Sequence, residues 1–227
     1  MLGSHLLEMT WRDALFCHWP VASATVDERL PEGLEVATYD GDAYLGIVPF
    51  VMEDIRPRGV PFGLSFPELN HRTYVDGPRG RGVYFFNLDA DDPIGVPLAR
   101  WLFQLPYYRA SIQVRREDDR IEFTSHRTHR GAAPCHFDAT YGPTGEAFEA
   151  DPSSLTAFLL ENYRFYAAGN DLYCGEIDHE PWPIQRGTVD LRSNTLFETN
   201  DFEHPGGEPI VHYSPGIDVT AGRVHRV

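Results

Sequence analysis

One stretch, residues 66–75 (FPELNHRTYV), constrains the fold most, because its residue types favour a strand while both of its faces carry polar groups. Successive side chains of a strand point to opposite sides. One side therefore carries an acid, an amide, a guanidinium and a phenol: Glu68, Asn70, Arg72 and Tyr74. Such a row suits either a solvated surface or the lining of a pocket.

The neighbouring segments favour the pocket. Residues 43–52 and 82–88 are two apolar runs of β type, and strands formed from them would bury residues 66–75 as their neighbour. A buried charge is costly unless it is paired, so an enclosed Glu68 and Arg72 would need each other or a ligand. The alternative is an edge strand with one solvated face.

The charge balance is strongly acidic. The chain has 34 acidic residues against 19 basic ones, a formal net charge of −15, and no lysine, so that every basic residue is an arginine. We hypothesise that this composition reflects a halophilic, high-salt cytoplasm, where self-repulsion is screened and carboxylates maintain solubility. The acidic charge and the lack of a basic patch argue against nucleic acid as a partner.

Length and targeting features predict one cytoplasmic domain over residues 1–227. A chain of this length with 42% hydrophobic residues can bury a large core. No run of about 18 apolar residues occurs, and residues 1–10 lack the pattern of a signal peptide, so we expect no membrane association. Three dispersed cysteines without a Cys-x-x-Cys pair argue against a disulfide or zinc-ribbon scaffold, and Cys17 is expected in the core.

Hydrophobic periodicity predicts a mainly β (α+β) chain. Strands are expected at residues 34–39, 43–55, 66–75, 82–88, 107–115, 120–128, 134–141, 171–177, 185–191 and 210–213, with an Asp40-Gly41 hairpin turn. Residues 11–20 are interpreted as a helical turn running into a strand. Helices are expected at 23–30, capped by Ser23, at 91–105, and from Asp151 through Tyr163. Short strands in meander order favour a curled antiparallel sheet or barrel with two or three flanking helices.

Six segments together resemble the uncharacterised YqjF-like family over nearly the whole chain. They are HWPV at 18–21, VPF at 48–50, FPELN at 66–70 with RTYV at 72–75, GVYFF at 82–86, LPY at 105–107 and PWP at 181–183. That family is in turn similar, more distantly, to acetoacetate decarboxylase. The resemblance implies a cone-shaped β-barrel with a central cavity, and self-association as a homo-oligomer.

The decarboxylase resemblance can be carried over at few residues. Its active-site glutamate looks like Glu68 in Phe66-Pro67-Glu68. A helix end of the decarboxylase looks like Ala99-Arg100-Trp101. The decarboxylase segment that follows it, which contains the Schiff-base lysine, looks like Pro106-Tyr107-Tyr108. Tyrosine stands where the catalytic lysine would be. Imine formation needs an amine, so Schiff-base chemistry is rejected for a chain without lysine.

Three function hypotheses remain. The first is a protein that binds a small polar or anionic molecule in the cavity, with Asn70, Arg72, Arg100 and Tyr108 as ligand-binding residues, because guanidinium groups are natural carboxylate receptors. The second is a lysine-independent lyase, hydratase or isomerase acting on a small oxo-acid, with Glu68 as base and Tyr107 as acid. The third is a structural or partner-binding module whose barrel is filled by aromatic side chains. No cofactor is predicted.

Histidines raise the question of a metal site. His126, His129, Cys135 and His136 fall within eleven residues and offer zinc ligands, but their spacing matches no established pattern, and we predict structural or surface histidines and no metal. Residues 178–180 (DHE) precede a proline and predict a solvated turn.

Overall fold

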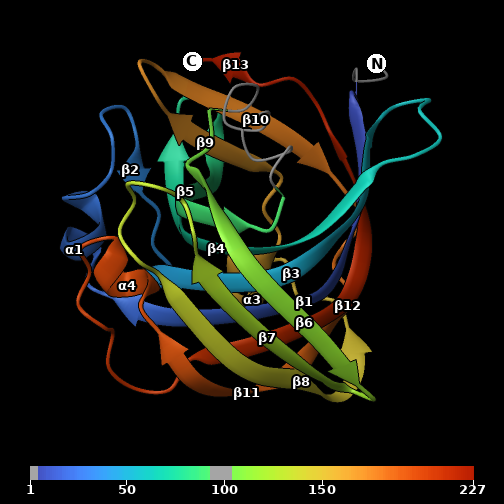
Figure 1. Cartoon of the computed structure of the whole chain (residues 1–227). Coiled ribbons are helices and arrows are strands. Elements are labelled where there is room, and N and C mark those ends of the chain that lie inside the picture. The colour runs from blue at the N-terminus through green and yellow to red at the C-terminus, as the bar shows by residue number, and fades with distance from the viewer. Residues whose placement is uncertain (1–4, 93–103) are drawn as a thin grey trace.

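Alternating apolar residues fold most of the chain into strands (Figure 1). The computed structural model describes residues 5–92 and 104–227. Its strands are β1 (Leu7–Val21), β2 (Glu35–Val36), β3 (Ala43–Pro57), β4 (Leu64–Gly77), β5 (Gly80–Ala90), β6 (Tyr107–Glu117), β7 (Arg120–Arg127), β8 (His136–Phe148), β9 (Arg164–Ala168), β10 (Leu172–Asp178), β11 (Ile184–Asn194), β12 (Ile210–Ala221) and β13 (His225–Arg226). The described helices are α1 (Ser23–Asp27), α3 (Leu155–Leu160) and α4 (Leu196–Thr199).

The strands form one sheet that curls and branches. Its pairings close a large ring in the order β4, β5, β6, β7, β8, β11, β12, β1 and β3. A second ring leaves the first at β5 and returns through β9 and β10 to β12. Strands β12, β1, β3, β4 and β5 belong to both rings, so they form a wall with one ring on each side. The predicted mainly β class with a curled sheet and flanking helices is confirmed.

The sheet is not purely antiparallel, as the meander interpretation had expected. Strand β5 pairs in parallel with β6 and with β9. Parallel neighbours need a long crossover connection, and the segment between Ala90 and Tyr107 supplies one. Local hairpins follow the expected rule: Asp40 and Gly41 have φ of 52° and 92°, as a tight hairpin turn requires, and Tyr39 bridges to Asp42.

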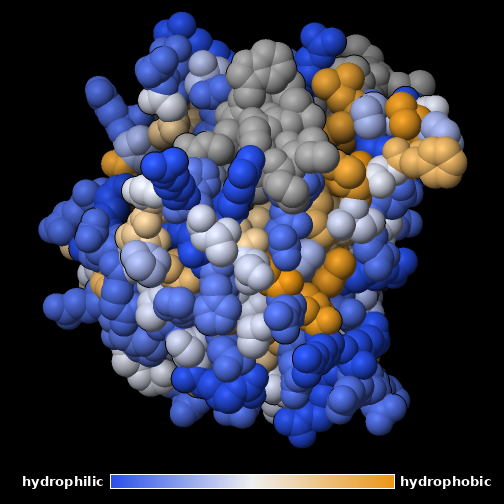
Figure 2. Space-filling view, viewed as in Figure 1, coloured by the Kyte–Doolittle hydropathy of each residue, from blue (hydrophilic) through white to orange (hydrophobic). Residues whose placement is uncertain are grey.

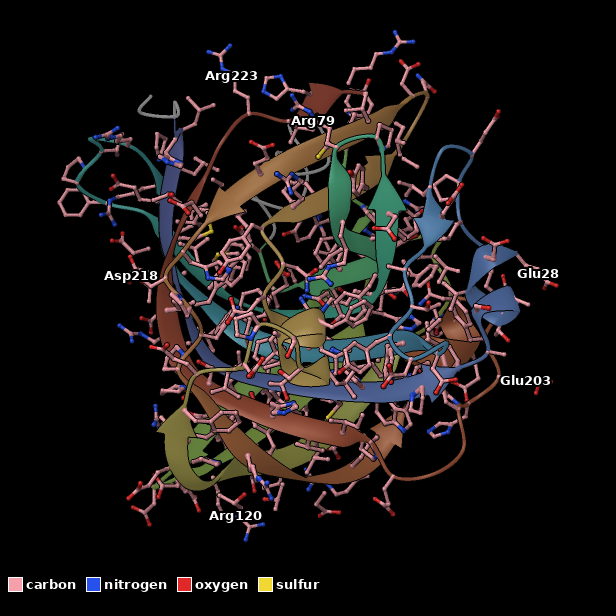
Figure 3. The ribbon with its side chains drawn as sticks, turned by 180° about the vertical axis from the view of Figure 1, so that it is seen from behind. Glu28, Arg79, Arg120, Glu203, Asp218 and Arg223 are labelled. Atoms are coloured by element: carbon pink, nitrogen blue, oxygen red, sulfur yellow. The ribbon has the colours of Figure 1, made fainter. Side chains whose placement is uncertain are left out.

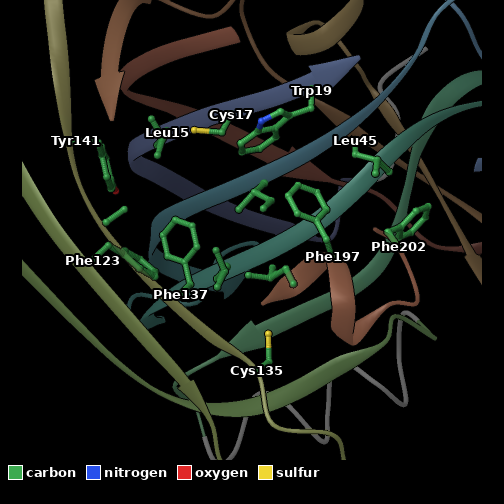
Figure 4. Packing of buried hydrophobic residues seen from close by; sticks show 14 of the residues in the cluster. Leu15, Cys17, Trp19, Leu45, Phe123, Cys135, Phe137, Tyr141, Phe197 and Phe202 are labelled. Carbon is green, nitrogen blue, oxygen red and sulfur yellow. The ribbon is translucent and has the colours of Figure 1, made fainter. Parts of the chain in front are cut away.

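Two apolar clusters occupy the two sides of the shared wall. The larger one fills the large ring with aromatic and aliphatic side chains, including Trp19, Leu45, Phe123, Phe137 and Phe197 (Figure 4). The other cluster lies on the opposite face of β1, β3 and β4. Strand β3 is buried on both faces, which explains its nearly continuous apolar sequence. Cys17 lies in the larger cluster, as expected.

Strand β1 replaces the helical turn predicted for residues 11–20. The register of β1 against β3 shifts between Arg12 and Cys17, and Asp13 lies in this bulge with φ of 51°. The extra residue changes the alternation, so that Trp11 and Phe16 face the same cluster although they are five positions apart. This irregular spacing of aromatic residues conceals the strand in the sequence.

The helices are shorter than predicted. Helix α1 ends at Asp27, and Ser23 makes no capping bond. Helix α3 is capped by Ser154, whose side chain accepts from Ala157 N, and it ends at Leu160 because the chain turns into β9. Most of the helix expected at 91–105 lies outside the described residues. None of the helices in the described part of the chain has the length and apolar composition that a membrane crossing requires.

Candidate ligand-binding site

Strand β4 lies inside the sheet, between β3 and β5. The edge-strand alternative is therefore wrong, and the flanking apolar runs do enclose this strand. Its alternation places Glu68, Asn70 and Arg72 on one face, where they line a cavity. The opposite face carries Leu69, which packs in the filled cluster.

The cavity has a volume of about 130 Å³ and lies on the side of the shared wall that faces β9 and β10. Most of its lining is apolar, with aromatic rings from Trp11, Phe16, Phe50, Phe85, Phe165 and Trp182. The polar lining residues among those described are Glu68, Asn70, Arg72, Tyr107, Asn162, Arg164 and His179. An apolar pocket with a few convergent polar groups is the usual form of a small-molecule site.

Glu68 is the acid of this cavity, and only 2% of its surface is exposed. Tyr107 donates its hydroxyl to Glu68 Oε2 at 2.7 Å, and Asn70 Nδ2 donates to Oε1 at 3.5 Å. Burial raises the pKa of Glu68 to about 7, although both hydrogen bonds and the charge of Arg72 act to lower it. Burial and the neighbouring carboxylate raise the pKa of Tyr107 well above its ordinary value, so this phenol stays protonated.

Arg72 is the cation of the same wall. Its Nε and Nη2 atoms are buried and have no hydrogen-bond partner among the described residues, and its guanidinium lies 5.4 Å from the centre of the Phe16 ring. Burial lowers the pKa of Arg72, while Tyr74 and Glu68 act to raise it. Within the described chain Arg72 and Glu68 form no ion pair within 4.0 Å, so the enclosed charges do not satisfy each other.

Tyr74 continues the same face of β4 but takes a structural role. Its hydroxyl donates to Leu159 O at 2.6 Å and lies 2.6 Å from His18 Nε2. Because the phenol proton is used toward Leu159, the imidazole must donate through Nε2. This network ties the end of α3 to β1 and β4.

Tyr108 is not brought to the cavity. It neighbours Tyr107 in β6 and therefore points to the other face of the strand, where its ring lies 4.1 Å from the guanidinium of Arg127. Arg127 makes a buried bidentate ion pair with Asp89, with both N–O distances at 2.7 Å. Arg100, the remaining predicted ligand residue, lies outside the described residues.

The histidine and cysteine segment forms local structure. His126 and His136 face each other across β7 and β8, with their Nδ1 atoms 2.6 Å apart. His129 Nδ1 accepts from Arg109 N, and Cys135 is buried. In residues 5–92 and 104–227 no three histidine, cysteine or acidic residues are grouped as metal ligands.

Three polar residues of the cavity, Asn162, Arg164 and His179, were missed from the sequence, and all three lie across the second ring from β4. Asn162 precedes β9, and His179 follows β10. The solvated turn predicted at 178–180 is therefore wrong for His179, which is only 9% exposed because it packs between Tyr163 and Trp182. The neighbouring PWP segment was the only signal for it, and Asn162 had none.

Comparison with known proteins gives one family and one fold. A family model, DUF2071, described as an uncharacterised conserved protein, matches residues 8–218. The chain is 37% identical over 221 residues to the uncharacterised protein YqjF of Bacillus subtilis (strain 168), covering 96% of this chain and 90% of that protein.

Solved structures resemble the chain at low sequence identity. One is the enduracididine biosynthesis enzyme MppR complexed with pyruvate, with a TM-score of 0.68 and 13% identity over 100% of this chain and 91% of that one. Another is acetoacetate decarboxylase from Legionella pneumophila, also with a TM-score of 0.68 and 13% identity, covering 98% and 87% of the two chains. At this identity the likeness establishes an acetoacetate decarboxylase-like fold.

Proposed function

From the premise that this chain belongs to the DUF2071 family and has an acetoacetate decarboxylase-like fold, we propose that it binds a small anionic molecule, a carboxylate, in the cavity beside β4. The observation that carries the proposal is Arg72, whose buried Nε and Nη2 lack protein partners in the described chain. Two guanidinium N–H groups side by side match the two oxygens of a carboxylate. A buried donor left unpaired is costly, so a ligand that accepts from it gains that energy.

Glu68 is compatible with an anion when it is protonated. Its pKa of about 7 leaves much of the population neutral near neutral pH. A neutral Glu68 and a protonated Tyr107 present no negative charge to the ligand. The MppR structure holds pyruvate in the same fold, which supports a small oxo-acid as the first ligand to test.

The test measures Kd by isothermal titration calorimetry. Pyruvate, acetate and benzoate are each titrated into wild type, Arg72→Met and Arg223→Met in high potassium chloride. Methionine keeps an apolar stem and removes the guanidinium. Hydrogen bonds to a charged group are worth about 1.5–3 kcal/mol, so Kd should rise about 10- to 100-fold in Arg72→Met. Arg223 is exposed and points away from the body of the protein (Figure 3), so its variant loses the same charge and should bind as wild type does. Equal binding by all three proteins would refute the carboxylate site.

A second candidate function is proton abstraction from a small oxo-acid, as in a lyase, hydratase or isomerase. The favouring observation is the 2.7 Å hydrogen bond from Tyr107 to Glu68, whose pKa of about 7 suits a general base. Glu68 would take a proton from the carbon next to the carbonyl, and the protonated phenol would stabilise the enolate oxygen. Exchange of the pyruvate methyl protons in deuterium oxide, followed by proton NMR, tests this step. Exchange that is no faster with wild type than with Glu68→Gln would exclude it.

A further inference from the structure

The far side of the cavity carries two hydrogen-bond acceptors without a partner in the described chain. Arg164 lines the same side, but its Nε lies 3.5 Å from the carboxylate of Glu176, which supplies its counter-charge. Asn162 donates its Nδ2 to Phe158 O at 3.0 Å, which fixes the amide so that Oδ1 remains as an acceptor. His179 Nδ1 lies 2.7 Å from Glu180 O, which can only accept, so Nδ1 donates and Nε2 is the ring nitrogen left to accept. Both acceptor atoms are buried and lack a partner among the described residues.

These two acceptors belong to side chains that are more than nine-tenths buried. Asn162 is 8% exposed and His179 is 9% exposed, and both line the cavity. The hydrogen bond from Asn162 to Phe158 O satisfies a carbonyl at the end of α3. It uses only Nδ2 of the Asn162 amide and leaves Oδ1 without a donor. A buried acceptor without a donor costs free energy, as an unpaired donor does.

Aromatic rings separate the acceptor atoms of Asn162 and His179 from the donor atoms of Arg72. His179 lies 5.4 Å from Trp182, Trp182 lies 5.1 Å from Phe16, and the Arg72 guanidinium lies 5.4 Å from Phe16. The path from the acceptors to the donors therefore runs along two rings that line the cavity. The strand order also places the acceptors opposite Arg72. Around the second ring, β10 is separated from β4 by three strand pairings in one direction and by four in the other, so the two strands lie on opposite sides of the ring.

We propose that the ligand is an amphipathic acid with two polar ends: a carboxylate that accepts from Arg72, and a hydroxyl or N–H group that donates to His179 Nε2 and Asn162 Oδ1, joined by an aryl or compact alkyl body. This inference rests on the proposed carboxylate site and adds a second polar group at the opposite end of the ligand. The cavity volume of about 130 Å³ is close to that of the apolar cavity of roughly 150 Å³ that binds benzene, so the body of the ligand is limited to a single ring or a short alkyl chain.

The test compares acids that differ by one hydroxyl. Benzoate is paired with 4-hydroxybenzoate, and phenylacetate with 4-hydroxyphenylacetate, so that two spans are covered. In wild type the hydroxylated acid of at least one pair should bind about tenfold more tightly, as expected for one net hydrogen bond. In His179→Phe, which keeps the ring contacts, this ratio should fall to near one while Kd of the parent acid changes less than about threefold.

A matched control is Tyr163→Phe. Tyr163 stacks on His179 at 4.6 Å, but its hydroxyl donates to Glu161 outside the cavity, so the tenfold ratio should persist. A further control uses a different ligand and no variant. 4-Methoxybenzoate has no hydroxyl proton to donate, so it should bind wild type no more tightly than benzoate.

The outcomes separate this inference from the proposed function. If pyruvate or any parent acid binds but no hydroxylated acid is preferred, or if the preference survives in His179→Phe, the inference is overturned and the carboxylate site stands. If none of these acids binds wild type, the carboxylate site itself is overturned.

Discussion

Replacing Glu68 by glutamine should stabilise the protein, and the gain should grow with pH. The pKa of Glu68 lies near 7 in the folded chain against 4.5 for an unperturbed glutamate. Below about pH 4.5 both states hold the proton, so the group has no effect on stability. Between pH 4.5 and 7 the unfolded state loses its proton first, and stability falls as pH rises by up to about 1.4 kcal/mol per pH unit. Above pH 7 the full loss of about 3 kcal/mol is reached.

Glutamine avoids this loss because it cannot ionise. Its side-chain oxygen can still accept from Tyr107, and its amide can donate to Asn70 Oδ1, which has no partner among the described residues, after a turn of the Asn70 amide. The free energy of unfolding of Glu68→Gln minus that of wild type should therefore increase by about 2–3 kcal/mol between pH 5 and pH 8, since a small part of the loss is already present at pH 5.

Urea unfolding followed by tryptophan fluorescence at pH 5, 6, 7 and 8 measures this difference, provided the m-values agree. Glu203→Gln is the control, because Glu203 is exposed and points outward (Figure 3), and its difference from wild type should stay flat. A difference for Glu68→Gln that does not change with pH, or that falls as pH rises, would refute the buried, proton-binding description of this carboxyl.

Three further predictions concern other parts of the molecule. Phe123→Ala should cost about 3–5 kcal/mol in urea unfolding, because this ring is fully buried in the filled cluster, whereas Phe62→Ala should cost less than about 0.5 kcal/mol, since Phe62 is 83% exposed; equal costs would contradict the assigned core. Asp89→Asn should destabilise by about 3–5 kcal/mol by leaving Arg127 buried without its counter-charge, and restoration by Arg127→Met in the double variant would identify the pair as the cause. Raising potassium chloride from 0.1 to 2 M should raise Tm, because a net charge of −15 repels itself and polar residues cover most of the visible face (Figure 2); a Tm that falls with salt would remove the high-salt hypothesis.

The parts of the fold that follow local rules could be predicted from the sequence. Strand β4 and the polar face built by Glu68, Asn70 and Arg72 follow from the alternation of side chains, and the Asp40-Gly41 turn follows from its residue types. Tyr107 is a harder case, since it reaches Glu68 from 39 positions away, and only the family resemblance pointed to it.

The far side of the site could not be predicted, because its acceptors arise from non-local structure. Asn162 and His179 acquire free acceptor atoms only when their other atoms bond to Phe158 O and Glu180 O and when β9 and β10 close the second ring. The bulge at Asp13 in β1 was equally hidden, since one extra residue shifts the alternation without changing residue types.

The two faces of β1, β3 and β4, which belong to the shared wall, are packed to different degrees. One face packs a solid aromatic interior, and the other lines a hollow. Residues that line the hollow, such as Phe16 and Phe50, also belong to the second apolar cluster, but each borders empty space on one side. A substitution there can therefore change the shape of the cavity while the filled cluster keeps the chain above its folding threshold. The shape of the cavity can therefore differ between lineages while the architecture is retained.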